Sequence, residues 1–138
     1  MKILAIDFGM KRMGFAVGNT ELGTTTPINP LTRKNQQHDN IYIQNIIAEY
    51  DINKIIIGHP LNMDGTKSDF TLQVEHFARQ IMEHFTIETE LVDERLSSFE
   101  ADEMLKEFQR DYKKRKKILD SISALVILRT YMESMGTS

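Results

Sequence analysis

The first strand and turn constrain the fold of this chain most. Residues 2–18 read KILAIDFGMKRMGFAVG, an apolar run followed directly by Asp7. Such a run is typical of a buried strand, so periodicity would place another apolar side chain where the carboxylate stands. Gly9 and Gly14 bracket a short polar turn, and the apolar residues after it predict the second strand of an antiparallel hairpin. Asp7 then lies at the open end of a sheet, where it either caps its own turn or belongs to a site.

The rest of the chain alternates between strand and helix patterns. A strand, a helix and another strand in this order favour a parallel crossover, which joins the later strands to the hairpin. The sequence therefore predicts an α/β fold, a mixed sheet of antiparallel N-terminal strands plus parallel strands flanked by helices, in one domain over residues 1–138. The predicted elements are an irregular edge strand at 23–31, a helix at 39–50, a strand at 54–58, a helix at 68–85, a strand at 87–92, a helix opening at 97 and a helix at 118–135.

Composition limits the class of protein. The 138 residues include no cysteine, which fits a reducing compartment, and no apolar run approaches the roughly 20 residues that span a bilayer, so we expect a cytoplasmic protein with no membrane association. The net charge of −3 excludes a protein that holds nucleic acid by overall charge. The basic side chains are concentrated instead in one run, either a solvated loop or a nucleic-acid contact: Arg110, Lys113, Lys114, Arg115, Lys116 and Lys117.

Three more acids stand beside apolar elements. Asp93 and Glu94 follow the strand at 87–92, and strand alternation does not say which of them points inward. The alternative is a solvated strand end with Arg95 as the partner. Asp120 begins the apolar stripe of the last helix, where it either belongs to a site or complements the helix dipole.

A divalent cation would explain how carboxylates from the first strand, a later strand end and the last helix could converge in one site. Carboxylates that converged in a partly dry site would repel one another strongly. Oxygen ligands without cysteine suit hard ions such as Mg²⁺ or Mn²⁺. One or two such ions would polarise a phosphodiester and activate a water molecule.

Four motifs, in this order and at this spacing, resemble the YqgF (RuvX) family of ribonuclease H-like proteins, which are related to RuvC-type Holliday junction resolvases and are linked to pre-16S rRNA processing. The motifs are IDFGMKRMGFAVG (6–18), GHPLNMDGT (58–66), VDERLSS (92–98) and LDSISALVIL (119–128). The resemblance covers nearly the whole chain. It implies a ribonuclease H-like sheet and metal-bound catalytic acids matched here by Asp7, Glu94 and Asp120, with Asp93 as a further candidate ligand.

The resemblance also implies a nucleic-acid surface. Lys11 and Arg12 match the family's basic turn after the first strand, and Asn62 and Gly65 match its loop after the fourth. The expected contacts to nucleic acid are Lys11, Arg12, Asn62, Arg95, Lys113, Lys114, Arg115, Lys116 and Lys117. The departures from the family pattern are Met10 in place of a small hydroxyl residue, Ser97 and Ser98 in place of a Thr pair, and Ser123 in place of Ala.

The resemblance implies a metal-dependent nuclease that hydrolyses phosphodiester bonds at the 5′ end of precursor 16S rRNA, in ribosome biogenesis. One alternative is a resolvase that cuts branched DNA, which would favour a dimer because symmetric cutting needs two active sites. Another alternative, of a different class, is a non-catalytic nucleic-acid-binding or regulatory protein. The expected oligomeric state is a monomer or a weak homodimer.

Overall fold

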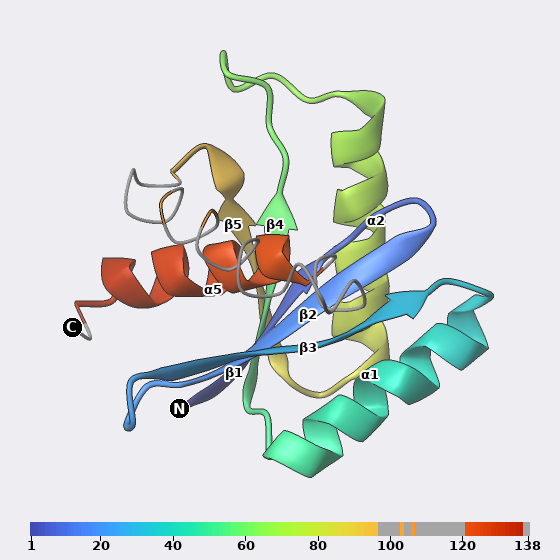
Figure 1. The fold of residues 1–138 in the computed structure, drawn as a ribbon. Helices are drawn as coiled ribbons and strands as arrows, with labels where there is room; N and C mark the ends of the chain where they lie inside the picture. The colour runs from blue at the N-terminus through green and yellow to red at the C-terminus, as the bar shows by residue number, and fades with distance from the viewer. Residues whose placement is uncertain (97–102, 104–105, 107–120, 137–138) are drawn as a thin grey trace.

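A five-stranded mixed sheet forms the middle of the molecule in a computed structural model, which describes residues 1–96, 103, 106 and 121–136 (Figure 1). The described elements, in chain order, are β1 Lys2–Asp7, β2 Arg12–Asn19, β3 Thr24–Thr32, α1 Gln36–Tyr50, β4 Lys54–His59, α2 Asp69–His84, β5 Glu88–Asp93, the 3₁₀ turn η1 Glu94–Leu96 and α5 Ile122–Ser134.

The strand order is β3-β2-β1-β4-β5, and β1 occupies the centre. The pairs β1–β2 and β2–β3 are antiparallel, whereas β4 pairs in parallel with both β1 and β5. The predicted hairpin, edge strand and parallel crossover are therefore confirmed. Because β1, β4 and β5 are parallel, their carboxyl ends meet at one edge of the sheet.

Helices cover both faces of the sheet. One buried cluster joins β1 residues Leu4 and Ile6 to α1 and α2, and the other joins Ile3 and Ala5 to α5. Side chains of a strand alternate between faces, so Asp7 continues the series that faces α5. Of the helices that the structure describes, none has the length and apolar character needed to cross a membrane.

Local capping explains where the helices begin. The helix α1 begins at Gln36, three residues before the predicted start, because the Asn35 side chain accepts a hydrogen bond from His38 N at 2.8 Å. Before α5, the buried Ser121 hydroxyl accepts a hydrogen bond from Phe15 N at 3.1 Å and donates one to a β3 carbonyl, which holds the start of α5 against β2 and β3. The predicted helix opening at 97 lies almost wholly outside the described residues.

Candidate active site

Asp7 is the last residue of β1 and lies opposite Gly14 of β2. Burial raises the pKa of its carboxyl from 3.8 to about 6, because the charged form has lost much of its hydration. No hydrogen bond joins this carboxylate to the described turn residues 8–14, so the turn-capping interpretation has no contact to rest on there. Asp7 is a half-buried acid whose charged form has lost much of its contact with water.

Glu94 reaches over β4 toward Asp7. A Cβ added at Gly58 would lie 2.6 Å from Ile127 Cδ1 and 2.8 Å from Glu94 Oε1, so only glycine leaves room there for the carboxylate. Burial, together with the negative charges of Asp7 and Asp93, raises the pKa of Glu94 from 4.5 to about 7. Asp7 ends β1 and Glu94 follows β5, so the two carboxylates lie at the carboxyl ends of the parallel strands on either side of β4, where the charge of one opposes ionisation of the other.

Asp93 turns to a different partner. Arg95 Nη2 lies 2.8 Å from Asp93 Oδ2, Arg95 Nε lies 3.1 Å from both carboxylate oxygens, and the Arg95 backbone N–H donates to Oδ1 at 2.9 Å. These contacts hold the pKa of Asp93 below its usual range. The pKa values of the two adjacent acids are therefore shifted in opposite directions, down for Asp93 beside a guanidinium and up for Glu94 near the charges of Asp7 and Asp93.

The loop after β4 is a closed turn at the same edge of the sheet. Asn62 donates through Nδ2 to the Thr66 hydroxyl at 2.9 Å, and its carbonyl accepts from Gly65 N at 2.8 Å. Gly65 has a φ of 86°, which favours glycine. Arg95 Nη1 also approaches Met63 O at 3.4 Å, so Arg95 connects this loop to the end of β5. The exposed side chain of Asn62 is used to shape the loop.

Lys11 and Arg12 are exposed on the turn that follows β1, as a phosphate contact would require. Gly9 makes the turn tight, because a Cβ there would lie 2.4 Å from Arg12 O. Arg33 fixes its shape by donating through Nη1 to Gly9 O at 3.0 Å and to Met10 O at 2.9 Å. Sequence reasoning missed both Arg33 and Gly58. The glycine that closes the run KIIIG was a visible signal for Gly58, but no sequence pattern pointed to Arg33.

Part of the predicted site lies outside the described residues, namely Asp120 and the basic run Lys113, Lys114, Arg115, Lys116 and Lys117. Within the part of the chain that the structure describes, no group of three His, Cys, Asp or Glu side chains could hold a metal ion. Asp7 and Glu94 would supply two ligands, so a third protein ligand would have to come from elsewhere in the chain. The role of Asp120 stays a prediction.

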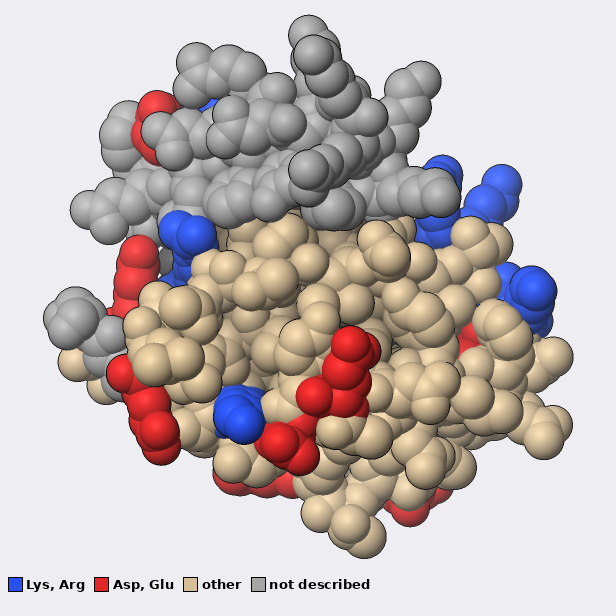
Figure 2. Space-filling view, turned by 60° about the horizontal axis from the view of Figure 1, so that its bottom comes forward, with Lys and Arg blue, Asp and Glu red and all other residues tan. Residues whose placement is uncertain are grey.

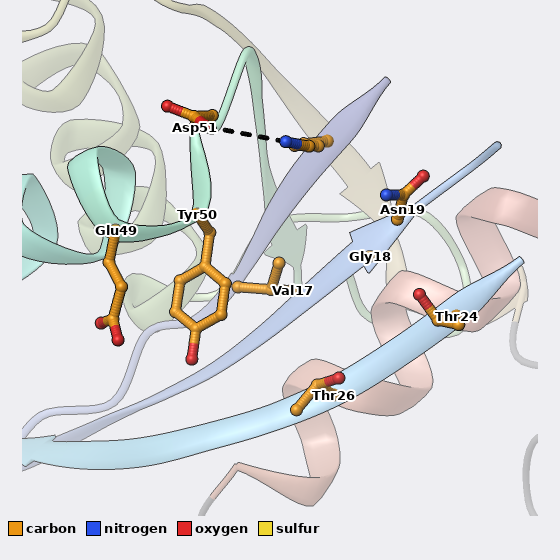
Figure 3. Close-up of a pocket in the computed structure, with 9 residues that line it drawn as sticks. Val17, Gly18, Asn19, Thr24, Thr26, Glu49, Tyr50 and Asp51 are labelled. Carbon is orange, nitrogen blue, oxygen red and sulfur yellow. Dashed lines mark ion pairs between the residues drawn. The ribbon is translucent and has the colours of Figure 1, made fainter. Parts of the chain in front are cut away.

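A separate hollow of about 270 Å³ lies at the opposite end of β1 (Figure 3). It is lined in part by Asn19, Glu49 and Asp51, and Asp51 pairs with Lys2 at 3.7 Å. It contains none of the predicted site residues. On the face shown in Figure 2, the charged side chains of the described residues lie in small separate groups on a mostly uncharged surface. The described residues on that face form no continuous basic patch that would attract a polyanion.

A mixed sheet with half-buried carboxylates at the meeting ends of its parallel strands is a ribonuclease H-like fold with a candidate acidic centre. A family model described as RuvX, Holliday junction resolvase, matches residues 1–134. The chain belongs to the RuvX family.

Curated relatives match over nearly their whole length. Proteins named "Putative pre-16S rRNA nuclease" from Syntrophomonas wolfei and Lachnospira eligens are 37% and 38% identical, over 96% and 97% of this chain and 94% and 98% of theirs. The protein of the same name from Escherichia coli O7:K1 is 41% identical over 95% of both chains.

Solved structures of Holliday junction resolvases share the fold. Thermus thermophilus RuvC in complex with a Holliday junction superposes with a TM-score of 0.61 at 9% identity, over 99% of this chain and 97% of that one. Fowlpox virus resolvase in complex with junction DNA gives a TM-score of 0.60 at 15% identity, over 98% and 99% of the two chains. At this identity the likeness extends to the fold alone.

Proposed function

We propose that this chain is a metal-dependent nuclease that hydrolyses phosphodiester bonds of precursor 16S rRNA in the cytoplasm, acting through Asp7, Glu94 and Asp120. The observation that carries the proposal is the Asp7 and Glu94 pair, two half-buried carboxylates with raised pKa values at the carboxyl ends of the parallel strands. The relatives of 37–41% identity, named for pre-16S rRNA, support the substrate.

The donor set fits a hard divalent cation. Oxygen ligands suit Mg²⁺ or Mn²⁺, and positive charge would offset the burial and the repulsion that together raise the pKa of Glu94. Asp7 and Glu94 would hold the ion together with Asp120, and Asp93 is a less favourable ligand because Arg95 already pairs with it. Bound there, one or two cations would supply Lewis-acid activation of a water molecule and stabilise the leaving oxygen.

The protein's own groups would position the substrate. Lys11 and Arg12, exposed on the turn after Asp7, would attract the phosphate backbone. Arg95 would order the end of β5 through Asp93 and could also face phosphate at its exposed edge. Because Asp7 and Glu94 must lose protons before they bind a cation, activity should rise as the pH passes through about 6 to 7.

Cleavage of branched DNA is the second candidate. It is favoured by the family description and by the fold shared with resolvases crystallised on Holliday junctions. Junction cutting would require a dimer with two active sites, whereas single-strand processing requires one. We therefore propose a single-domain monomer, or a weak homodimer, for the rRNA activity.

A substrate panel tests the proposal. Purified protein is offered precursor 16S rRNA fragments, a four-way DNA junction and a linear duplex of the same sequence, with Mg²⁺ or Mn²⁺ and with EDTA. Metal-dependent cleavage of the precursor, lost in Asp7→Asn, is the expected result. Junction cutting with intact precursor would support the second candidate. Binding without cleavage of any substrate would indicate a non-catalytic or regulatory protein.

A further inference from the structure

Two adjoining hollows lie on the other side of the β1–β2 turn from the acidic centre. Their volumes are about 350 and 530 Å³, within the range of ligand sites, and they share Met10, Arg33, His76, Phe77 and Gln80. They lie between this turn, the connection from β3 to α1, and α2, three segments that come together beside α2 in Figure 1. We call the two hollows the Met10 groove.

The Met10 groove begins one residue from the acidic centre. Phe8 follows Asp7 and faces the opposite side of the sheet, where it joins the cluster packed against α1 and α2. Lys11 and Arg12 lie exposed on the turn between the two sites. A strand with one phosphate at Asp7 and Glu94 could therefore cross this basic turn and place a neighbouring nucleotide in the groove.

The walls are flat and apolar. The Phe8 ring packs on Phe77, with centroids 4.6 Å apart, and the Arg33 guanidinium lies 4.4 Å above the Phe8 centroid. Met10 and Leu72 line the same hollow with exposed fractions of 59% and 50%, although both are apolar. Unpaired bases stack on aromatic rings and guanidinium planes. The two phenylalanine rings are themselves buried, so the surface open to a base is formed by Met10, Leu72 and the Arg33 guanidinium that the rings support.

Polar side chains form the rim. Gln73, His76 and Gln80 project from one face of α2 at helical spacing and line the hollow. Amide groups carry both donors and acceptors, as the edge of a base requires. The groove thus combines stacking surfaces with hydrogen-bonding groups at its border.

Lys34 is exposed at the larger hollow, but around Arg33 the charge in the groove disfavours phosphate. Asp39 lines the larger hollow, is only 6% exposed, and lies 3.8 Å from Arg33 Nε. Arg33 Nη1 is already bonded to Gly9 O and Met10 O. The positive charge of Arg33 is therefore countered by a carboxylate that would repel an anion, while its guanidinium plane is held in place. An uncharged ring fits better than a phosphate group.

We infer that the Met10 groove binds one unpaired base of the substrate strand, next to the cleaved phosphodiester, by stacking against Met10 and Arg33 and by hydrogen bonds from Gln80. The inference rests on the proposed nuclease function. It also gives a role to Met10, which departs from the small hydroxyl residue of the family pattern. A base in a duplex cannot enter the groove without unpairing, so the site selects single-stranded or splayed substrate.

Binding of short RNA by fluorescence anisotropy tests the inference. All proteins carry Asp7→Asn so that the RNA stays intact. The probes are one single-stranded RNA and a set of copies with one abasic position each. The variants are Met10→Ser and Gln80→Ala, and Met82→Ser is the matched control because Met82 is 46% exposed on α2 and lines neither hollow.

Met10→Ser and Gln80→Ala should each weaken binding of the intact RNA about tenfold or more, as expected for loss of a stacked or hydrogen-bonded base. Met82→Ser should not change it. One abasic RNA should bind weakly to the parent and show no further loss with Met10→Ser. The salt dependence of binding should stay the same, because no phosphate contact is removed.

Three results would overturn the inference. In the first, Met10→Ser weakens the binding of every abasic RNA by the same factor. In the second, Met82→Ser weakens binding of the intact RNA as much as Met10→Ser does. The third is a salt slope smaller by about one unit in Met10→Ser or Gln80→Ala, which would assign the groove to phosphate. If the parent binds no RNA or DNA at all, the proposed function fails as well, whereas RNA binding that Met10→Ser and Gln80→Ala leave unchanged rejects the groove alone.

Discussion

Asp7→Asn should stabilise the metal-free protein at neutral pH. The folded pKa of Asp7 is raised from 3.8 to about 6, so the folded state binds the proton more tightly than the unfolded state does. Stability is then unaffected below pH 4, falls as the pH rises from about 4 to 6, and stays reduced above it. A pKa rise of this size corresponds to about 3 kcal/mol at most, and asparagine cannot ionise.

Urea unfolding in EDTA at pH 4.5 and pH 8 measures this effect. We expect the wild type to lose about 2 kcal/mol of unfolding free energy between the two pH values on account of Asp7, and Asp7→Asn to lose correspondingly less. At pH 8 the variant should also melt about 5–10 °C higher. Comparing the pH dependence cancels any fixed cost of placing an amide in the site.

Asp93→Asn is the matched control, because Arg95 lowers the pKa of Asp93 and its ionised form stabilises the fold. This variant should be less stable than the wild type at pH 8, the opposite sign from Asp7→Asn. The reasoning would be refuted by an Asp7→Asn protein that keeps the full wild-type pH dependence, or by one that is clearly destabilised at pH 8. Either result would mean that the Asp7 carboxylate is satisfied within the folded protein.

Two further predictions concern the space beside Glu94 and the basic run. Gly58→Ala should displace the Glu94 carboxylate, because the added Cβ would lie 2.8 Å from Oε1. We expect a loss of about 1–3 kcal/mol in unfolding free energy and at least a tenfold drop in kcat. An unchanged kcat would show that the carboxylate position does not matter. Replacing Lys113, Lys114 and Lys116 with Gln should flatten the dependence of log affinity on log salt by about two to three units for duplex DNA, whereas an unchanged slope would assign these side chains to solvent.

The architecture could be predicted because its signals are local. The apolar runs of β1 and β4, separated by an amphipathic helix, specify a parallel crossover, and Gly9 specifies the turn of the hairpin. The start of α1 was placed three residues late because the periodic apolar pattern begins only after its polar first turn, which the Asn35 cap supports.

The orientation of the two adjacent acids could not be predicted from the strand pattern. Alternation within β5 does not decide between Asp93 and Glu94 once the chain turns into η1. Two contacts decide it: the Arg95 guanidinium pairs with Asp93 two residues before it, and the missing side chain at Gly58, distant in sequence, admits Glu94. The Met10 groove was hidden for the same reason, because its walls come from three separated segments.

Metal-dependent cleavage of a precursor 16S rRNA fragment by wild type, Glu94→Gln and Asp93→Asn tests the central claim most directly. The wild type should cleave with Mg²⁺ or Mn²⁺ and stop in EDTA. Glu94→Gln should lose at least about 100-fold in kcat, more than is typical for residues that only support metal ligands, and Asp93→Asn should lose less than about tenfold. Three results would contradict an acidic metal centre built on Asp7 and Glu94. They are cleavage that persists in EDTA, wild-type turnover by Glu94→Gln, and a larger loss of kcat in Asp93→Asn than in Glu94→Gln.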